Sequence, residues 1–166
     1  MKPEIKLPME RIVVNTGVGR LRQRPDFESK VLPYIMDTLA AITGQRPEKT
    51  AAKRSIAEFR MREGDVVGLK VTLRGRRATD FLSRFVNAVL PRVRDFRGLS
   101  ESAIDEHGNL NIGVHDQSVF PEVNMDDSVT EFGMQITIVG AYQNKTRMTE
   151  AYRAYGVPLT GLRTKA

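Results

Sequence analysis

The residues between 78 and 90 repeat in the pattern of one helix face, which limits the chain to folds in which a helix covers a partner layer. The apolar positions are Ala78, Phe81, Leu82, Phe85, Val86, Val89 and Leu90. They recur every three or four residues, as one side of an α-helix requires. Pro91 follows and predicts the end of the helix. A helix with one apolar side must bury that side, so we expect a layered globular fold.

Two further segments predict helices. Between Val31 and Ile42 the apolar residues again recur at intervals of three and four, and Thr43-Gly44 predicts the end. Pro33 means that this helix either begins near that residue or kinks there. Residues 144–155 predict a last helix, with Gly156 and Pro158 as its stop signal.

Alternating and β-branched runs predict the strands. They lie at residues 11–15, 55–60, 66–73 and 134–139, with shorter strand-like pieces in 109–123. In the third run, Lys70 and Thr72 point outward if Leu69, Val71 and Leu73 point inward. The glycine-containing stretch 62–65 indicates a hairpin between the second and third runs. We therefore predict an α+β fold: a mainly antiparallel β-sheet with helices packed on one face.

Size and composition are those of a globular protein. The 166 residues fit a single domain over 1–166, with 40% hydrophobic and 28% charged residues. The chain has no cysteine, which excludes disulfides, thiolate catalysis and cysteine-based metal sites and fits a reducing cytosol. No apolar run approaches the length of a membrane span, and the first eleven residues lack the apolar core of a secretory signal. We expect a cytoplasmic protein without a membrane partner.

Charge is segregated along the chain. Residues 44–77 hold ten Lys or Arg and four acidic residues, an excess equal to the whole net charge of +6. Residues 101–131 hold eight acidic residues and no Lys or Arg. Such segregation favours at least one charged partner, although it can also serve solubility.

Patterns of catalytic sites are weak. His107 and His115 lie near Asp105, Glu106 and Asp116, but their spacing fits no metal template, and Asp-Glu-His-Gly-Asn is typical of a surface turn. Gly17-Val-Gly19 follows a strand, yet Arg22 stands where a dinucleotide-binding loop needs its third glycine. We predict no catalytic residue, no cofactor and no metal. A metal- or phosphate-dependent enzyme using the two histidines stays as an alternative.

The basic segment has the residue types that bind RNA. Arg and Lys attract phosphates, and Ser, Thr and Gln add directional hydrogen bonds; both kinds occur in 44–55 and 70–77. On a strand, Lys70, Thr72 and Arg74 share one face at a pitch of about 6.6 Å, similar to the spacing of phosphates along an RNA strand. Phe59 is either a stacking surface for an unpaired base or a core residue.

Several collinear motifs resemble one known family along nearly the whole chain. They are Ile12-Val-Val-Asn-Thr-Gly-Val-Gly19, the signature-like stretch 39–55, Ser55–Gly64, Val71–Gly75, Leu90-Pro-Arg-Val-Arg-Asp-Phe-Arg-Gly98, Gly108-Asn109, Phe120–Glu122 and Gly133–Thr137. In order and content they resemble the bacterial-type large-subunit ribosomal protein five, which binds 5S ribosomal RNA (rRNA). The resemblance implies a structural, non-enzymatic role in the cytoplasmic ribosome. A non-ribosomal RNA-binding module is the other possible interpretation.

The resemblance also implies site residues and partners. The family binds 5S rRNA with one surface of its sheet, which carries over to Arg11, Asn15, Gln45, Phe59, Thr72 and Arg74, with Lys49, Thr50, Lys53 and Ser55 as supporting residues. It implies attachment of 5S rRNA to the large-subunit rRNA in the central protuberance. It further implies a protruding β-hairpin whose tip, Arg62, Glu63 and Gly64, approaches P-site transfer RNA (tRNA). The sequence departs from the family near this tip, with Val66-Val67 where Pro-Ile is common. The acidic segment 101–131 is expected to face a protein of the small-subunit head in an intersubunit bridge.

Overall fold

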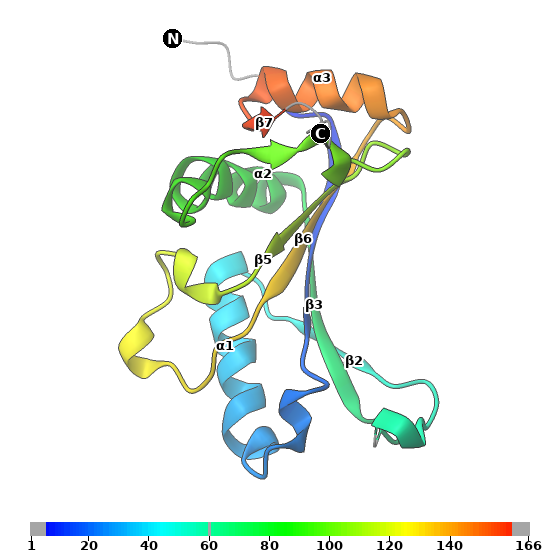
Figure 1. Cartoon of the computed structure of the whole chain (residues 1–166), viewed down its shortest axis with the longest axis vertical. Helices are drawn as coiled ribbons and strands as arrows, with labels where there is room; N and C mark the ends of the chain where they lie inside the picture. Colours follow the sequence, from blue (N-terminus) through cyan, green and yellow to red (C-terminus); the bar gives the residue numbers. More distant parts are fainter. Residues whose placement is uncertain (1–5, 60, 161–166) are drawn as a thin grey trace, which may run out of the picture. The chain divides into compact units, whose positions relative to one another are not determined.

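The computed structural model describes residues 6–59 and 61–160, without the side chain of Phe59 (Figure 1). Its α-helices are α1 (Leu32–Thr43), α2 (Gly75–Arg84) and α3 (Lys145–Tyr155). Its strands are β1 (Met9–Gly17), β2 (Glu48–Ala51), β3 (Val66–Arg74), β4 (Leu99–Ser100), β5 (Leu110–Val114), β6 (Met134–Gly140) and β7 (Leu159–Thr160). A mainly antiparallel sheet has the strand order β2-β3-β1-β6-β5, and β4 pairs with β7 in parallel. The predicted α+β fold is confirmed.

Burial alternates along the strands and separates a covered face from an open one. On β1 the buried residues are Ile12, Val14 and Thr16, and on β3 they are Leu69, Val71 and Leu73. β6 and β5 alternate in the same way. The residues between these buried positions, Lys70 and Thr72 among them, are partly exposed. The predicted inward and outward sides of residues 69–73 are therefore confirmed.

The described chain forms two compact units. Unit 1 contains residues 6–13, 73–113 and 136–160, and unit 2 contains the described residues of 14–72 together with 114–135. The single domain predicted for residues 1–166 stays a prediction.

In unit 1, the packing of α3 depends on a close approach of backbone at Gly108. The Asn144 side chain accepts a hydrogen bond from the Arg147 N–H at 3.0 Å and begins α3, and Gly156 ends it in the left-handed conformation. The buried Tyr152 hydroxyl donates to the Gly108 carbonyl at 2.9 Å. Burial raises the pKa of Tyr152, so this hydroxyl stays protonated and remains a donor. The predicted last helix is confirmed.

In unit 2, α1 begins one residue before Pro33, and a π-helical turn (Phe27–Val31) precedes it. Pro33 is the second residue of α1, so the α-helix begins near this proline, as one of the two alternatives predicted from the sequence, and the π-turn is the helical path before it. Ile35, Leu39 and Ile42 are fully buried. The Tyr34 hydroxyl donates to the Ser128 hydroxyl at 3.1 Å, which joins the loop between β5 and β6 to α1.

The strand predicted at 55–60 is wrong. Ile56 forms only an isolated bridge with Met61, and Ala57–Phe59 is one turn of 3-10 helix; position 60 lies outside the described residues. β2 pairs with β3 instead, in antiparallel register Glu48↔Lys70, Lys49↔Leu69 and Thr50↔Gly68. All four residues of β2 are exposed, so no apolar alternation marked this edge strand. The protruding β-hairpin stays a prediction.

Candidate RNA-binding surface

The pairing of β2 with β3 sorts the predicted residues between the two faces of the sheet. Directly opposite residues of an antiparallel pair point to the same side. Thr50, opposite Gly68, therefore shares the open face with Lys70 and Thr72. Lys49, opposite the buried Leu69, points to the covered face, and it lines a pocket of about 410 Å³ with Phe27 and Leu32. The register thus separates two supporting residues that are neighbours in sequence.

Gln45 and Thr72 are brought together on unit 2. Gly44 ends α1 with φ of 71°, and this turn places the half-buried Gln45 beside β3. Its side-chain Nε2 donates to the Thr72 carbonyl at 3.2 Å. Gln45 therefore joins α1 to the sheet, whatever else it contacts.

Asn15 of β1 alternates with the buried Val14 and Thr16 and is partly exposed on the other side of the strand. Thr16 is held inward by its hydroxyl, which donates to the Gly133 carbonyl at 2.6 Å. Arg11 and Arg74 belong to unit 1. Arg11 pairs with Glu10 at 3.3 Å between exposed side chains, whereas Arg74 is exposed and its side chain does not cap α2.

The segment after β2 is held by hydrogen bonds to main-chain N–H groups. Lys53 and Ser55 are exposed, and the Ser55 hydroxyl accepts from the Glu63 N–H at 2.9 Å. The Asp65 carboxylate accepts from the Arg62 N–H at 2.6 Å. Gly64, with φ of 89°, makes the turn, and its N–H donates to the Ala52 carbonyl. Arg62 and Glu63 thus present exposed side chains on an ordered turn, while the Phe59 side chain lies outside the described part.

Two ion pairs of unit 2 were missed by reasoning from the sequence. Arg22 pairs with Asp65, which joins the turn to the short helical segment before α1, and Lys70 pairs with Glu48 at 3.3 Å across β2 and β3. The pairing of Arg22 with Asp65 spans more than forty positions and leaves no signal in local spacing. Glu48 and Lys70 could be matched only once the register of β2 was known.

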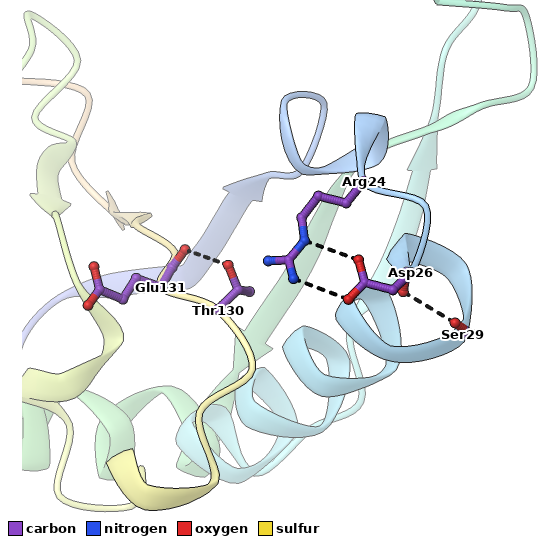
Figure 2. A network of polar contacts seen from close by, with 5 residues as sticks. All are labelled: Arg24, Asp26, Ser29, Thr130 and Glu131. Carbon is purple, nitrogen blue, oxygen red and sulfur yellow. Dashed lines mark hydrogen bonds and ion pairs between the residues drawn. The ribbon is translucent and has the colours of Figure 1, made fainter.

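Internal ion pairs distinguish the cations of unit 2. Figure 2 shows Arg24 directed at Asp26. The Arg24 guanidinium donates two hydrogen bonds of 3.1 Å to the Asp26 carboxylate. Among the described residues, no carboxylate lies within ion-pair distance of Lys49 or Lys53. The charges of these two lysines are therefore not neutralised by a carboxylate of the described residues.

The histidine region forms the surface turn expected of its sequence. Residues 106 and 107 lie in a turn that ends at Gly108, with φ of 81°. Partial burial acts to raise the pKa of Asp105, but hydrogen bonds from the Asn109 side chain and backbone outweigh it, and the pKa is lowered. In the part of the chain that the structure covers, no three His, Asp or Glu side chains gather as metal ligands would. Within the same residues, the helices are too short or too polar to cross a membrane.

Comparison with known proteins covers almost the whole chain. Residues 5–62 match the family model described as Ribosomal protein L5, and residues 66–159 match the model of the C-terminus of the same ribosomal family. Proteins named large ribosomal subunit protein uL5 are similar. That of Macrococcus caseolyticus is 47% identical over 150 residues, which are 90% of this chain and 82% of the relative. That of Carboxydothermus hydrogenoformans is 42% identical over 160 residues, 96% of this chain and 87% of the relative.

These similarities extend through both units and confirm the resemblance seen in the motifs. The family consists of structural, non-enzymatic proteins of the large ribosomal subunit that bind rRNA and act in translation, in the cytoplasm of bacteria. With two family models spanning the chain and relatives above 40% identity over nine tenths of it, the chain belongs to the ribosomal protein L5 family.

Proposed function

We propose that this ribosomal protein binds 5S rRNA and attaches it to the large-subunit rRNA in the central protuberance. The observation that carries the proposal is the open face of β1, β2 and β3. In unit 2 this face presents Asn15, Thr50 and Thr72, and the exposed Lys53 and Ser55 follow β2. It offers hydrogen-bond donors on a sheet beside Lys53, which has no carboxylate within ion-pair distance among the residues that the structure describes. Arg11 and Arg74 extend the same strands, and Gln45 and Phe59 complete the proposed contacts.

The chemistry of such a surface suits a folded RNA. Lysine and arginine contribute a salt-sensitive attraction to phosphates, which supplies most of the affinity. Threonine, asparagine and glutamine groups at defined positions can recognise the shape of RNA loops. They can also hydrogen-bond to the 2′-hydroxyl groups that distinguish RNA from DNA. Lys49 points to the other face, so we assign it a supporting, electrostatic role.

Replacing Lys53 and Arg74 together with glutamine is expected to weaken 5S rRNA binding by about tenfold or more, because each cation contacts a phosphate. Both side chains are exposed, so the free energy of unfolding should stay the same. Filter binding measures the affinity, and footprinting of 5S rRNA identifies the nucleotides that lose protection. The matched control is Lys30→Gln with Lys145→Gln, which removes the same charge from exposed positions elsewhere. Equal losses in both double variants, or none in either, would refute the proposed surface.

We further propose that the turn at Arg62, Glu63 and Gly64 forms the tip of a hairpin that approaches P-site tRNA. Its main-chain N–H groups, not the side chains of Arg62 and Glu63, make the hydrogen bonds that shape the turn. The two side chains are therefore available to a partner. The exposed acidic residues Glu122, Asp126, Asp127 and Glu131 in turn suit a basic protein of the small-subunit head.

Changing Arg62 and Glu63 to alanine should leave 5S rRNA affinity within about twofold of the original, because neither side chain belongs to the proposed 5S surface. The same variant should alter P-site tRNA binding by reconstituted ribosomes. The turn itself should persist, since its hydrogen bonds come from the main chain. A loss of 5S rRNA affinity would place the tip within the 5S surface and contradict its assignment to tRNA.

A further inference from the structure

The connection between β2 and β3, residues 52–65, is held together at Asp65. The Asp65 carbonyl accepts a hydrogen bond from the Ala52 N–H at 2.8 Å, and the Asp65 N–H donates to the Arg62 carbonyl at 3.2 Å. The Asp65 carboxylate in turn accepts from the Arg62 N–H at 2.6 Å. Because the bonds to Ala52 and Arg62 converge on one residue, Asp65 joins the beginning of this connection to its end.

The same carboxylate forms an ion pair with Arg22, which lies outside the connection. The Asp65 Oδ2 atom that accepts from the Arg62 N–H also faces the Arg22 guanidinium. The exposed fraction is 24% for the Arg22 side chain and 23% for the Asp65 side chain, compared with 42% and 32% in the pair of Arg24 and Asp26. Water and salt screen a charge pair less when it is partly buried. The pair of Arg22 and Asp65 is therefore stronger than a comparable pair at a fully exposed position.

Arg22 is itself attached to the sheet. It belongs to the 3-10 turn Leu21–Gln23 that follows β1. Its N–H donates to the Val18 carbonyl at 3.1 Å, and the N–H of the fully buried Val18 donates to the Val67 carbonyl of β3 at 3.0 Å. A closed ring of contacts thus runs from Val67 through Val18 and Arg22 to Asp65, the residue before β3. This ring fixes the direction in which the connection leaves the sheet.

The main chain at Lys53 is placed by hydrogen bonds of the residue before it. The Ala52 N–H donates to the Asp65 carbonyl, and the Ala52 carbonyl accepts from the Gly64 N–H at 3.0 Å. The Lys53 side chain is exposed, and among the described residues no carboxylate lies within ion-pair distance of it. The place from which Lys53 reaches a phosphate is therefore set by Ala52, and through Ala52 by Asp65.

We propose that Asp65 is a positioning residue for RNA binding, whose ion pair with Arg22 holds Lys53 in the place where it contacts a phosphate. The proposal rests on the proposed function, in which Lys53 belongs to the 5S surface. The Asp65 carboxylate repels a phosphate, so Asp65 acts only through the residues that it holds. Its two effects have opposite signs: its charge weakens RNA binding, and its hold on the connection strengthens it. Neutralising Asp65 therefore separates the two effects.

Changing Asp65 to asparagine removes the charge and keeps the shape of the side chain. An amide oxygen can still accept from the Arg62 N–H, so the turn should persist. Charge alone predicts tighter binding of 5S rRNA by this variant, whereas loss of the position of Lys53 is expected to weaken it by about three- to tenfold. Glu58→Gln is the matched control, because Glu58 is an exposed acidic residue of the same connection. Its affinity, measured like the other by filter binding, should stay the same or rise by up to about twofold.

A double-mutant cycle with Lys53→Gln tests whether Asp65 acts through Lys53. In the Lys53→Gln protein, adding Asp65→Asn should change 5S affinity by less than about twofold, because the residue that Asp65 positions is already gone. Arg22→Gln should weaken binding at least as much as Asp65→Asn. These two neutralisations change the net charge in opposite directions, so a general effect of charge does not explain a loss in both. Arg22→Lys keeps a cation opposite Asp65 and should bind within about twofold of the unaltered protein.

The outcomes separate this inference from the proposed function. Unchanged or tighter 5S binding by Asp65→Asn overturns the inference, and so does a loss of equal size with and without Lys53. Failure of the unaltered protein to bind 5S rRNA refutes the proposed function instead, and hydrogen exchange of the free protein then tests the ion pair alone. Faster exchange of the Ala52 and Gly64 N–H groups in Asp65→Asn than in Glu58→Gln supports the hold of Asp65 on the connection, and equal rates contradict it.

Discussion

Replacing Gly108 with alanine is expected to lower the free energy of unfolding by about 2 to 5 kcal/mol. A Cβ at this position would lie 2.6 Å from Met148 Cγ, 2.9 Å from Met148 Cβ and 2.9 Å from the Tyr142 carbonyl oxygen. Met148 is fully buried and Tyr142 contributes backbone, so neither can move easily. The φ of 81° adds the cost of the left-handed conformation for an L-residue. Urea denaturation followed by circular dichroism measures the loss.

Gly44→Ala is the matched control for this prediction. Gly44 has a similar φ of 71°, but an added Cβ would meet no atom within 4 Å. This variant should lose only about 1 kcal/mol, the backbone part of the cost. Equal losses for both variants would show that crowding against α3 contributes nothing, contrary to the close approach seen at Gly108.

Raising the salt concentration from 50 to 200 mM is expected to weaken 5S rRNA binding by about thirtyfold. The proposed contact surface contains three cations, Arg11, Lys53 and Arg74, while Lys49 points to the other face. Each phosphate contact contributes about 0.7 to 0.9 to the slope of log affinity against log salt, so three contacts give a slope of about −2.4. Affinity is measured by filter binding across a salt series at constant pH.

The Lys53→Gln, Arg74→Gln double variant should reduce the magnitude of this slope by about two. It therefore tests whether these two residues contribute to the electrostatic part of binding. Affinity independent of salt in the unaltered protein would contradict the electrostatic mechanism. A salt slope unchanged in the double variant would show that other cations meet the phosphates.

The helices were predictable because burial leaves a periodic trace in the sequence. The stripe from Ala78 to Leu90 became the buried side of α2 and of the turns after it. Asn144 begins α3 and Gly156 ends it, as the capping preferences of these residues predict. Strand β3 was predictable for the same reason, since Leu69, Val71 and Leu73 alternate with polar residues. The edge strand β2 has no buried residue and is defined by its backbone pairing with β3, so periodicity missed it.

The candidate site shows the same division. Residue types and collinear motifs indicated an rRNA-binding protein of this family, because both are properties of the linear chain. The tertiary structure decided which side chains share a face: the register with β3 turns Thr50 to the open side and Lys49 to the covered side. It also decided which charges are neutralised within the molecule, as in the pair of Arg22 and Asp65. By itself the sequence determined the helices, the buried strands and the family; register and long-range ion pairs required the tertiary structure, because they join residues whose spacing along the chain has no period.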